Sequence, residues 1–116
     1  MTIASAVLAA LLAVVMTAAG APKVLAVASM RERAAHAGIS VTGYRGIGVV
    51  EIAGAAGLLA GIGWYPIGLA AGVGVLLLMI GAIITHVRIG DALAEMVPAA
   101  VTGLLAVGYF AVTALA

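Results

Sequence analysis

Three titratable side chains lie within or beside long apolar segments of this sequence: Lys23, Glu51 and His86. An ammonium, a carboxylate and an imidazole can form ion pairs or pass protons, and each is costly in hydrocarbon unless it is paired, neutralised or hydrated. Glu51 is the hardest to accommodate, because the segment GIGVVEIAGAAGLLAG (46–61) has no other polar side chain. A carboxylate is also too short to reach the headgroups from such a position. We therefore expect Glu51 to face the interior of a helix bundle, with a protein or water partner.

Lys23 is the natural partner of Glu51, and His86 is the natural third member of the same cluster. Glu51 follows Arg45 by six residues, which places it about 9 Å below the membrane surface at the rise of a helix. Each residue also has a structural interpretation. Lys23 can extend to the headgroups, and a protonated His86 suits the C-terminal end of a helix. The sequence leaves open whether the cluster is structural or functional.

Arg88 and Tyr109 complete the candidate binding cluster. Arg88 follows His86 by two residues and so lies near the same surface. Tyr109 follows Thr102 by seven residues, which puts both on one face of a helix. We expect these side chains, together with Lys23 and Glu51, to converge in the cytoplasmic half of one bundle.

The elements that position this cluster are apolar helices. The chain has 116 residues, of which 66% are hydrophobic and 8% charged, whereas a soluble domain is nearer half apolar and a quarter charged. Segments of about 20 apolar residues cross a bilayer as helices. The sequence predicts an all-α, integral membrane, antiparallel four-helix bundle formed by a single domain over 1–116. The expected spans are 2–21 or longer, 46–63, 66–87 and 97–116.

All five Lys and Arg residues lie in the connection between the first two spans or in the one between the last two. The positive-inside rule places these connections in the cytoplasm and both termini outside, in what we expect to be a bacterial cytoplasmic membrane. The first connection, KVLAVASMRERAAHAG (23–38), contains no helix breaker before Gly38. Either the first span continues past Pro22 with a kink, or the chain restarts as a short interfacial helix ending at Gly38.

Several kinds of chemistry find no support in the residues. The chain has no cysteine, which excludes disulfides and thiolate metal sites carried by this chain alone. It has two histidines, too few for a convincing metal site, and no ligand pattern for haem, flavin or iron–sulfur clusters. A net charge of +1 gives no surface for nucleic acid.

Small residues recur four apart at Gly57 and Gly61, and again at Gly68 and Gly72. This spacing lets membrane helices approach closely. It indicates helix contacts, either within the bundle or between the subunits of a homo-oligomer.

A family resemblance follows from the ordered set of motifs. The stretch YRGIGVVEIAGAAGLLAGIG resembles the second helix of DoxX-like membrane proteins, in which a Gly-x-x-Glu core, here Gly48 to Glu51, precedes a Gly- and Leu-rich stretch. GAPKVLA resembles the lysine-bearing first helix of that family. MIGAIITHVRIGD resembles the end of its third helix, with His86, Arg88 and Asp91 in the matching places. The resemblance implies a kinship with a subunit of an archaeal thiosulfate:quinone oxidoreductase, and membrane partners of redox or detoxification enzymes.

Three functions remain open. The chain is an accessory subunit of a redox or quinone-linked system, a small oligomeric transport or permeation element, or a structural interaction bundle. Broken-helix signals are missing from the last three spans, which weakens the transport interpretation, and nothing indicates an autonomous enzyme. The expected partners are the lipid bilayer and a protein of a membrane redox complex. No covalently bound cofactor is expected, and a quinone or a lipid is the candidate ligand.

Overall fold

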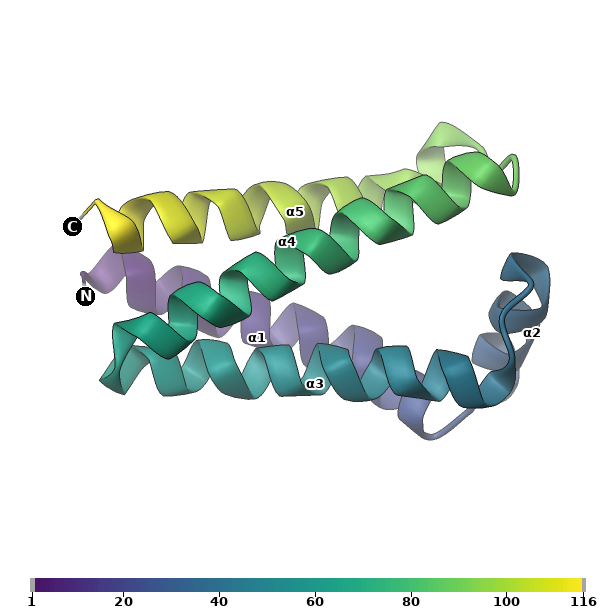
Figure 1. Cartoon of the computed structure of the whole chain (residues 1–116), viewed down its shortest axis with the longest axis horizontal. Helices are drawn as coiled ribbons and strands as arrows, with labels where there is room; N and C mark the ends of the chain where they lie inside the picture. Colours follow the sequence, from purple (N-terminus) through teal and green to yellow (C-terminus); the bar gives the residue numbers. More distant parts are fainter. Residues whose placement is uncertain (1, 116) are drawn as a thin grey trace.

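Four long helices and one short helix make up the computed structural model, which describes residues 2–115. In chain order they are α1 (Ile3–Val24), α2 (Ala28–Ala37), α3 (Val41–Gly63), α4 (Tyr65–Arg88) and α5 (Leu93–Ala114). The four long helices have 22 to 24 residues and are apolar enough to cross a membrane. They run in alternating directions, so that both termini lie at one end of the bundle and α2 at the other (Figure 1). The predicted all-α, antiparallel membrane bundle is confirmed.

The helix ends follow from local chemistry. α1 runs through Pro22 without interruption and stops at Val24, and α2 then forms a separate helix, so both alternatives for the first connection occur together. α2 ends at Gly38, whose φ of 72° is the left-handed conformation that glycine adopts without strain. α3 begins at Val41, five residues before the expected start of its span. The reason is that the Ser40 hydroxyl accepts a hydrogen bond from the Gly43 N–H at 3.0 Å and caps a polar first turn.

The end that carries both termini is tightly packed around Tyr109, which has no exposed surface. A Cβ atom added to Gly61 would lie 2.4 Å from the Gly68 Cα, and one added to Gly68 would lie 2.1 Å from the Tyr109 hydroxyl oxygen. The small-xxx-small motifs therefore hold α3 against α4 and α5 within the bundle. These motif glycines make contacts within one chain, and a homo-oligomer through Gly-rich helix faces stays a prediction.

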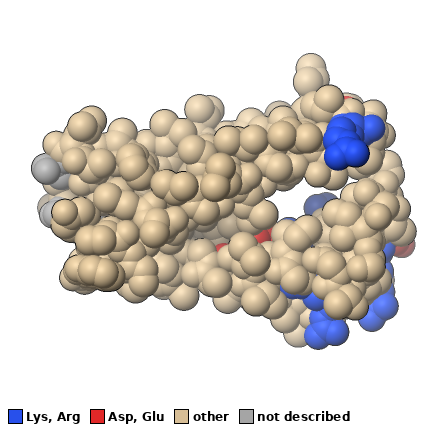
Figure 2. Space-filling view, in the orientation of Figure 1, with Lys and Arg blue, Asp and Glu red and all other residues tan. Residues whose placement is uncertain are grey.

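The opposite end, which we call the α2 end, is more open. There the pair α1 and α3 separates from the pair α4 and α5, and the short helix α2 lies across the end of α1 and α3 (Figure 1). α2 is exposed except at its contact side, where Ala34 is 1% exposed. All Lys and Arg atoms visible in Figure 2 gather at this end, as the distribution of basic residues in the sequence requires.

Candidate functional site

A cavity of about 950 Å³ occupies the α2 end, between the two helix pairs. Figure 2 shows it as an opening through the side of the bundle, with acidic atoms on its inner wall. Its apolar lining includes Met16, Leu78 and Met79. Its polar lining includes Lys23, Arg33, Glu51, His86, Glu95 and Thr102. A smaller hollow of about 340 Å³ between α3 and α4 has only apolar and glycine lining residues, and we attach no chemistry to it.

Close helix contact brings Lys23 and Glu51 together on one wall of the cavity. α1 and α3 cross at Gly20 and Gly48, where a Cβ atom added to Gly48 would lie 2.7 Å from the Gly20 carbonyl oxygen and 2.7 Å from the Lys23 Cβ. Glu51 lies three residues after Gly48 and therefore on the same face of α3. The Lys23 Nζ lies 2.7 Å from the Glu51 Oε1. The expected ion pair is present.

The two partners differ in how fully they are satisfied. The Lys23 ammonium donates to the Ala19 carbonyl oxygen at 3.2 Å, contacts Glu51, and lies 5.5 Å from the centre of the Tyr44 ring, a cation–π distance. The Glu51 side chain is 3% exposed. Its Oε1 lies against the Lys23 ammonium, and among residues 2–115 no other donor bonds this oxygen.

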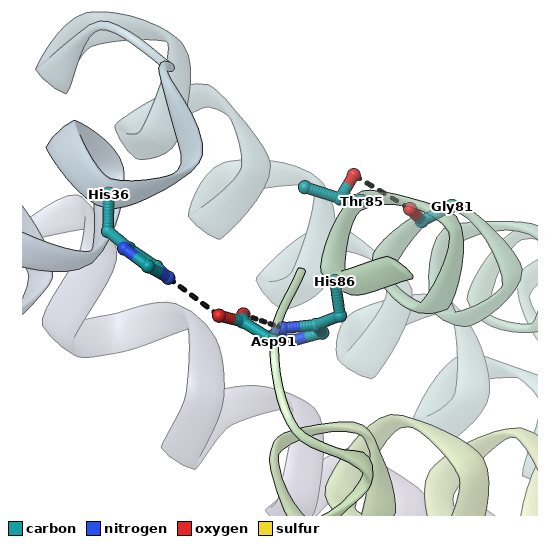
Figure 3. Close-up of polar contacts among 5 residues, drawn as sticks. All are labelled: His36, Gly81, Thr85, His86 and Asp91. Atoms are coloured by element: carbon teal, nitrogen blue, oxygen red, sulfur yellow. Dashed lines mark hydrogen bonds and ion pairs between the residues drawn. The ribbon is translucent and has the colours of Figure 1, made fainter. Parts of the chain in front are cut away.

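A second polar group closes the cavity towards α2. Asp91, in the turn between α4 and α5, lies between two histidines (Figure 3). Its Oδ1 is 2.6 Å from the His36 Nε2, and its Oδ2 is 2.5 Å from the His86 Nδ1. An ionised carboxylate only accepts, so both ring nitrogens must carry hydrogen. Hydrogen bonding from His36, and then from His86, holds the pKa of Asp91 below its ordinary value of 3.8. Asp91 thus ties α2 to the α4–α5 turn.

The structure divides the predicted cluster into three places. Lys23 and Glu51 form a pair, and His86 lines the same cavity but bonds Asp91 instead of Glu51. Arg88 is exposed and does not line the cavity. Tyr109 lies near the opposite end, because α5 runs away from α2 and seven residues of helix span about 10 Å.

The contact of His36 with Asp91 was missed by sequence reasoning, which gave His36 no role and mentioned Asp91 only within a resemblance. They are 55 residues apart, and no local pattern links them. Their only signal is that both are polar and lie in the two connections expected at the same end of the bundle.

Comparison with known protein families shows to which family this chain belongs. The sequence profile of the DoxX-like family matches residues 7–109, which include all four long helices in whole or in large part. The chain belongs to the DoxX-like family. No curated protein and no solved structure matches it.

The chemistry available in this DoxX-like protein is that of paired charges beside an apolar space. Among residues 2–115, no three His, Cys, Asp or Glu side chains converge in the way that metal ligands do. Lys23 is matched with Glu51 inside the cavity, and Asp91 is matched with two histidines at its α2 side. Such a site can accept hydrogen bonds from, or donate them to, an uncharged group that lies among apolar side chains.

Proposed function

We propose that this DoxX-like protein is an accessory membrane subunit of a redox system and that its cavity holds a quinone-type ligand. The observation that carries the proposal is an ion-paired carboxylate on the wall of a cavity of about 950 Å³ that opens through the side of a membrane bundle. A carboxylate within a membrane span marks a functional site by default.

The size and lining of the cavity support this class of ligand. Small-molecule sites enclose about 300–1,000 Å³ and are mostly apolar, with a few polar groups that fix orientation. A quinone has a flat, uncharged, polar ring and an apolar tail. The ring would lie beside Lys23 and Glu51, and the tail would contact side chains such as Leu78 and Met79. Because the opening faces sideways, a lipid-soluble molecule would enter from the bilayer without crossing water.

The accessory role follows from what the chain lacks in sequence. It has no cysteine and two histidines, and both histidines hydrogen-bond to Asp91. We therefore assign the electron-carrying groups to a partner protein. The α2 end, where the basic residues gather, is the side on which a cytoplasmic partner would approach.

The transport alternative predicts a polar path across the membrane. The described polar lining of the cavity ends at the level of Thr102, and the end beyond it is filled by Tyr109 packed against glycines. This arrangement favours a site with one polar entrance over a continuous pore.

The test combines purification with genetics. The protein, purified in mild detergent, should carry a redox partner, and deletion of its gene should lower a quinone-dependent activity of the membranes. Wild-type protein and the Glu32→Gln variant, which changes an exposed carboxylate outside the cavity, should restore that activity. Glu51→Gln should not. Unchanged activity after deletion, together with ion movement by the isolated protein in liposomes, would replace this proposal with the permeation function.

A further inference from the structure

The deepest polar part of the cavity has more hydrogen-bond acceptors than donors. An ionised carboxylate offers about four lone-pair positions, and among residues 2–115 the Lys23 ammonium is the one donor group against Glu51 Oε1. With 3% of its side chain exposed, Glu51 presents little surface to the water in the cavity. A group that enters the cavity and donates a hydrogen bond would remove the deficit.

Two donor groups beside Glu51 already have partners within the chain. The Lys23 ammonium donates to the Ala19 carbonyl, pairs with the Glu51 carboxylate and lies 5.5 Å from the centre of the Tyr44 ring. The Thr102 hydroxyl, which also lines the cavity, donates to the Pro98 carbonyl at 2.8 Å.

The remaining donors lie nearer the mouth. The Tyr44 backbone lies seven residues before Glu51 on α3, about 10 Å closer to the α2 end, but its ring reaches back to within 5.5 Å of the Lys23 Nζ. Arg33 is an exposed residue of α2, and His36 and His86 bond Asp91. A ligand whose head reaches Glu51 therefore meets an acceptor with unfilled positions, and the donors left to it are the Tyr44 hydroxyl and the Arg33 guanidinium on the α2 side of the cavity.

We infer that the cavity selects the reduced, hydroquinone form of its ligand, with a ring hydroxyl donating a hydrogen bond to Glu51. The inference rests on the proposed function for the class of ligand and adds to it which redox form binds. A hydroquinone has two hydroxyl donors, whereas the oxidised quinone has only carbonyl acceptors and would set an acceptor against a carboxylate. A site that hydrogen-bonds a hydroxyl rejects an analogue that lacks it much more strongly than a site that relies on apolar contact.

The experiment compares three molecules with the same tail: a decyl hydroquinone, its dimethyl ether and the corresponding benzoquinone. Binding is measured by calorimetry to the full chain in lipid nanodiscs under reducing or inert conditions, with empty nanodiscs as the partition baseline. The hydroquinone should bind about ten- to a hundredfold more tightly than the other two, as a hydrogen bond to a charged group provides. The ether keeps the aromatic ring, both oxygens and the tail but replaces each hydroxyl hydrogen with a methyl group, and the benzoquinone, which adds no bulk, controls for the size of those methyl groups.

The variants locate the preference. Glu51→Gln should reduce the ratio between hydroquinone and ether to less than about threefold. Glu32→Gln, which alters an exposed carboxylate outside the cavity, should leave the ratio unchanged. If Glu51→Gln is too unstable to purify, the double variant Lys23→Met with Glu51→Leu leaves no unpaired charge and should lose the preference as well.

The outcomes separate the two proposals. Equal and specific binding of hydroquinone, ether and quinone overturns the inference and leaves the proposed quinone-type site intact. Binding of none of the three above the empty nanodiscs overturns the proposed site itself. A preference for hydroquinone that persists in Glu51→Gln overturns the role assigned to Glu51.

Discussion

Removing either charge of the Lys23–Glu51 pair should destabilise the protein more than removing both. In Lys23→Met, the Glu51 carboxylate keeps its position, with 3% of its side chain exposed, but loses its cation. Breaking a buried pair in this way costs about 3–5 kcal/mol of the free energy of unfolding. We expect Lys23→Met to fall within this range.

Glu51→Gln should cost less, because the partner left behind is better placed. Lys23 is 15% exposed, donates to the Ala19 carbonyl and lies over the Tyr44 ring. Its flexible stem can also carry the ammonium towards the mouth of the cavity. We expect a loss of about 1–3 kcal/mol, below the range for a fully buried partner.

The double variant Lys23→Met with Glu51→Gln leaves no unpaired charge. Replacing a buried pair by neutral residues is often close to neutral for stability, so we expect the double variant to lie within about 2 kcal/mol of the wild type. The singles sum to about 4–8 kcal/mol, which gives a coupling energy of at least about 2 kcal/mol. Unfolding in mixed micelles at neutral pH measures all four proteins, and Glu32→Gln should change stability by less than about 0.5 kcal/mol. Additivity of the singles within about 0.5 kcal/mol would refute the ion pair.

Three further predictions concern topology, pH and packing. A reporter fused to the C-terminus should read as outside the cytoplasm, because the basic residues gather at the opposite end, and a cytoplasmic signal would reverse the orientation. Hydrogen bonding lowers the pKa of Asp91 below 3.8, so the stability it provides is present above that value and is lost as the pH falls through the lowered one. Spin labels on α2 and on the α4–α5 turn should therefore stay close from about pH 8 to about pH 4 and separate only below, and a separation near pH 6 would contradict this assignment. Gly68→Ala should lower the free energy of unfolding by about 1–3 kcal/mol, because its Cβ would lie 2.1 Å from the Tyr109 hydroxyl oxygen. Adding Tyr109→Phe to Gly68→Ala should recover much of that loss. The control Gly74→Ala, whose Cβ would have nothing within 4 Å, should leave stability unchanged.

The features that sequence reasoning predicted are those with a strong local energetic cause. Long apolar segments require helices in a bilayer, so the sequence alone was enough to predict the four-helix architecture. Glu51, alone in an apolar span, required a partner, and Lys23 was the cation at matching depth. Gly38 ended α2 because a left-handed residue was needed there.

The features that it missed depend on how the helices diverge. The separation of the helix pairs that creates the cavity follows from the whole set of contacts, with close glycine packing at the end that carries both termini and none equivalent between the pairs at the α2 end. The contact of His36 with Asp91 needs α2 to fold back towards the α4–α5 turn. Tyr109 shares a helical face with Thr102, but a shared face does not tell how far along the bundle a residue lies. Tyr109 lies near the end that carries both termini and therefore outside the cavity.

The arrangement around Glu51 favours a functional role over a purely structural one. A buried ion pair contributes little net stability, since the cost of removing two charges from water offsets their attraction. Glycine packing at Gly20 and Gly48 already holds α1 against α3 without help from the pair. If the pair served only to join these helices, close packing around it and hydrogen bonds to the carboxylate would make it most effective. Instead Glu51 has unused acceptor capacity and lines a cavity of about 950 Å³. A carboxylate kept in this state is less stable than an enclosed one, and a ligand that donates a hydrogen bond would recover the difference.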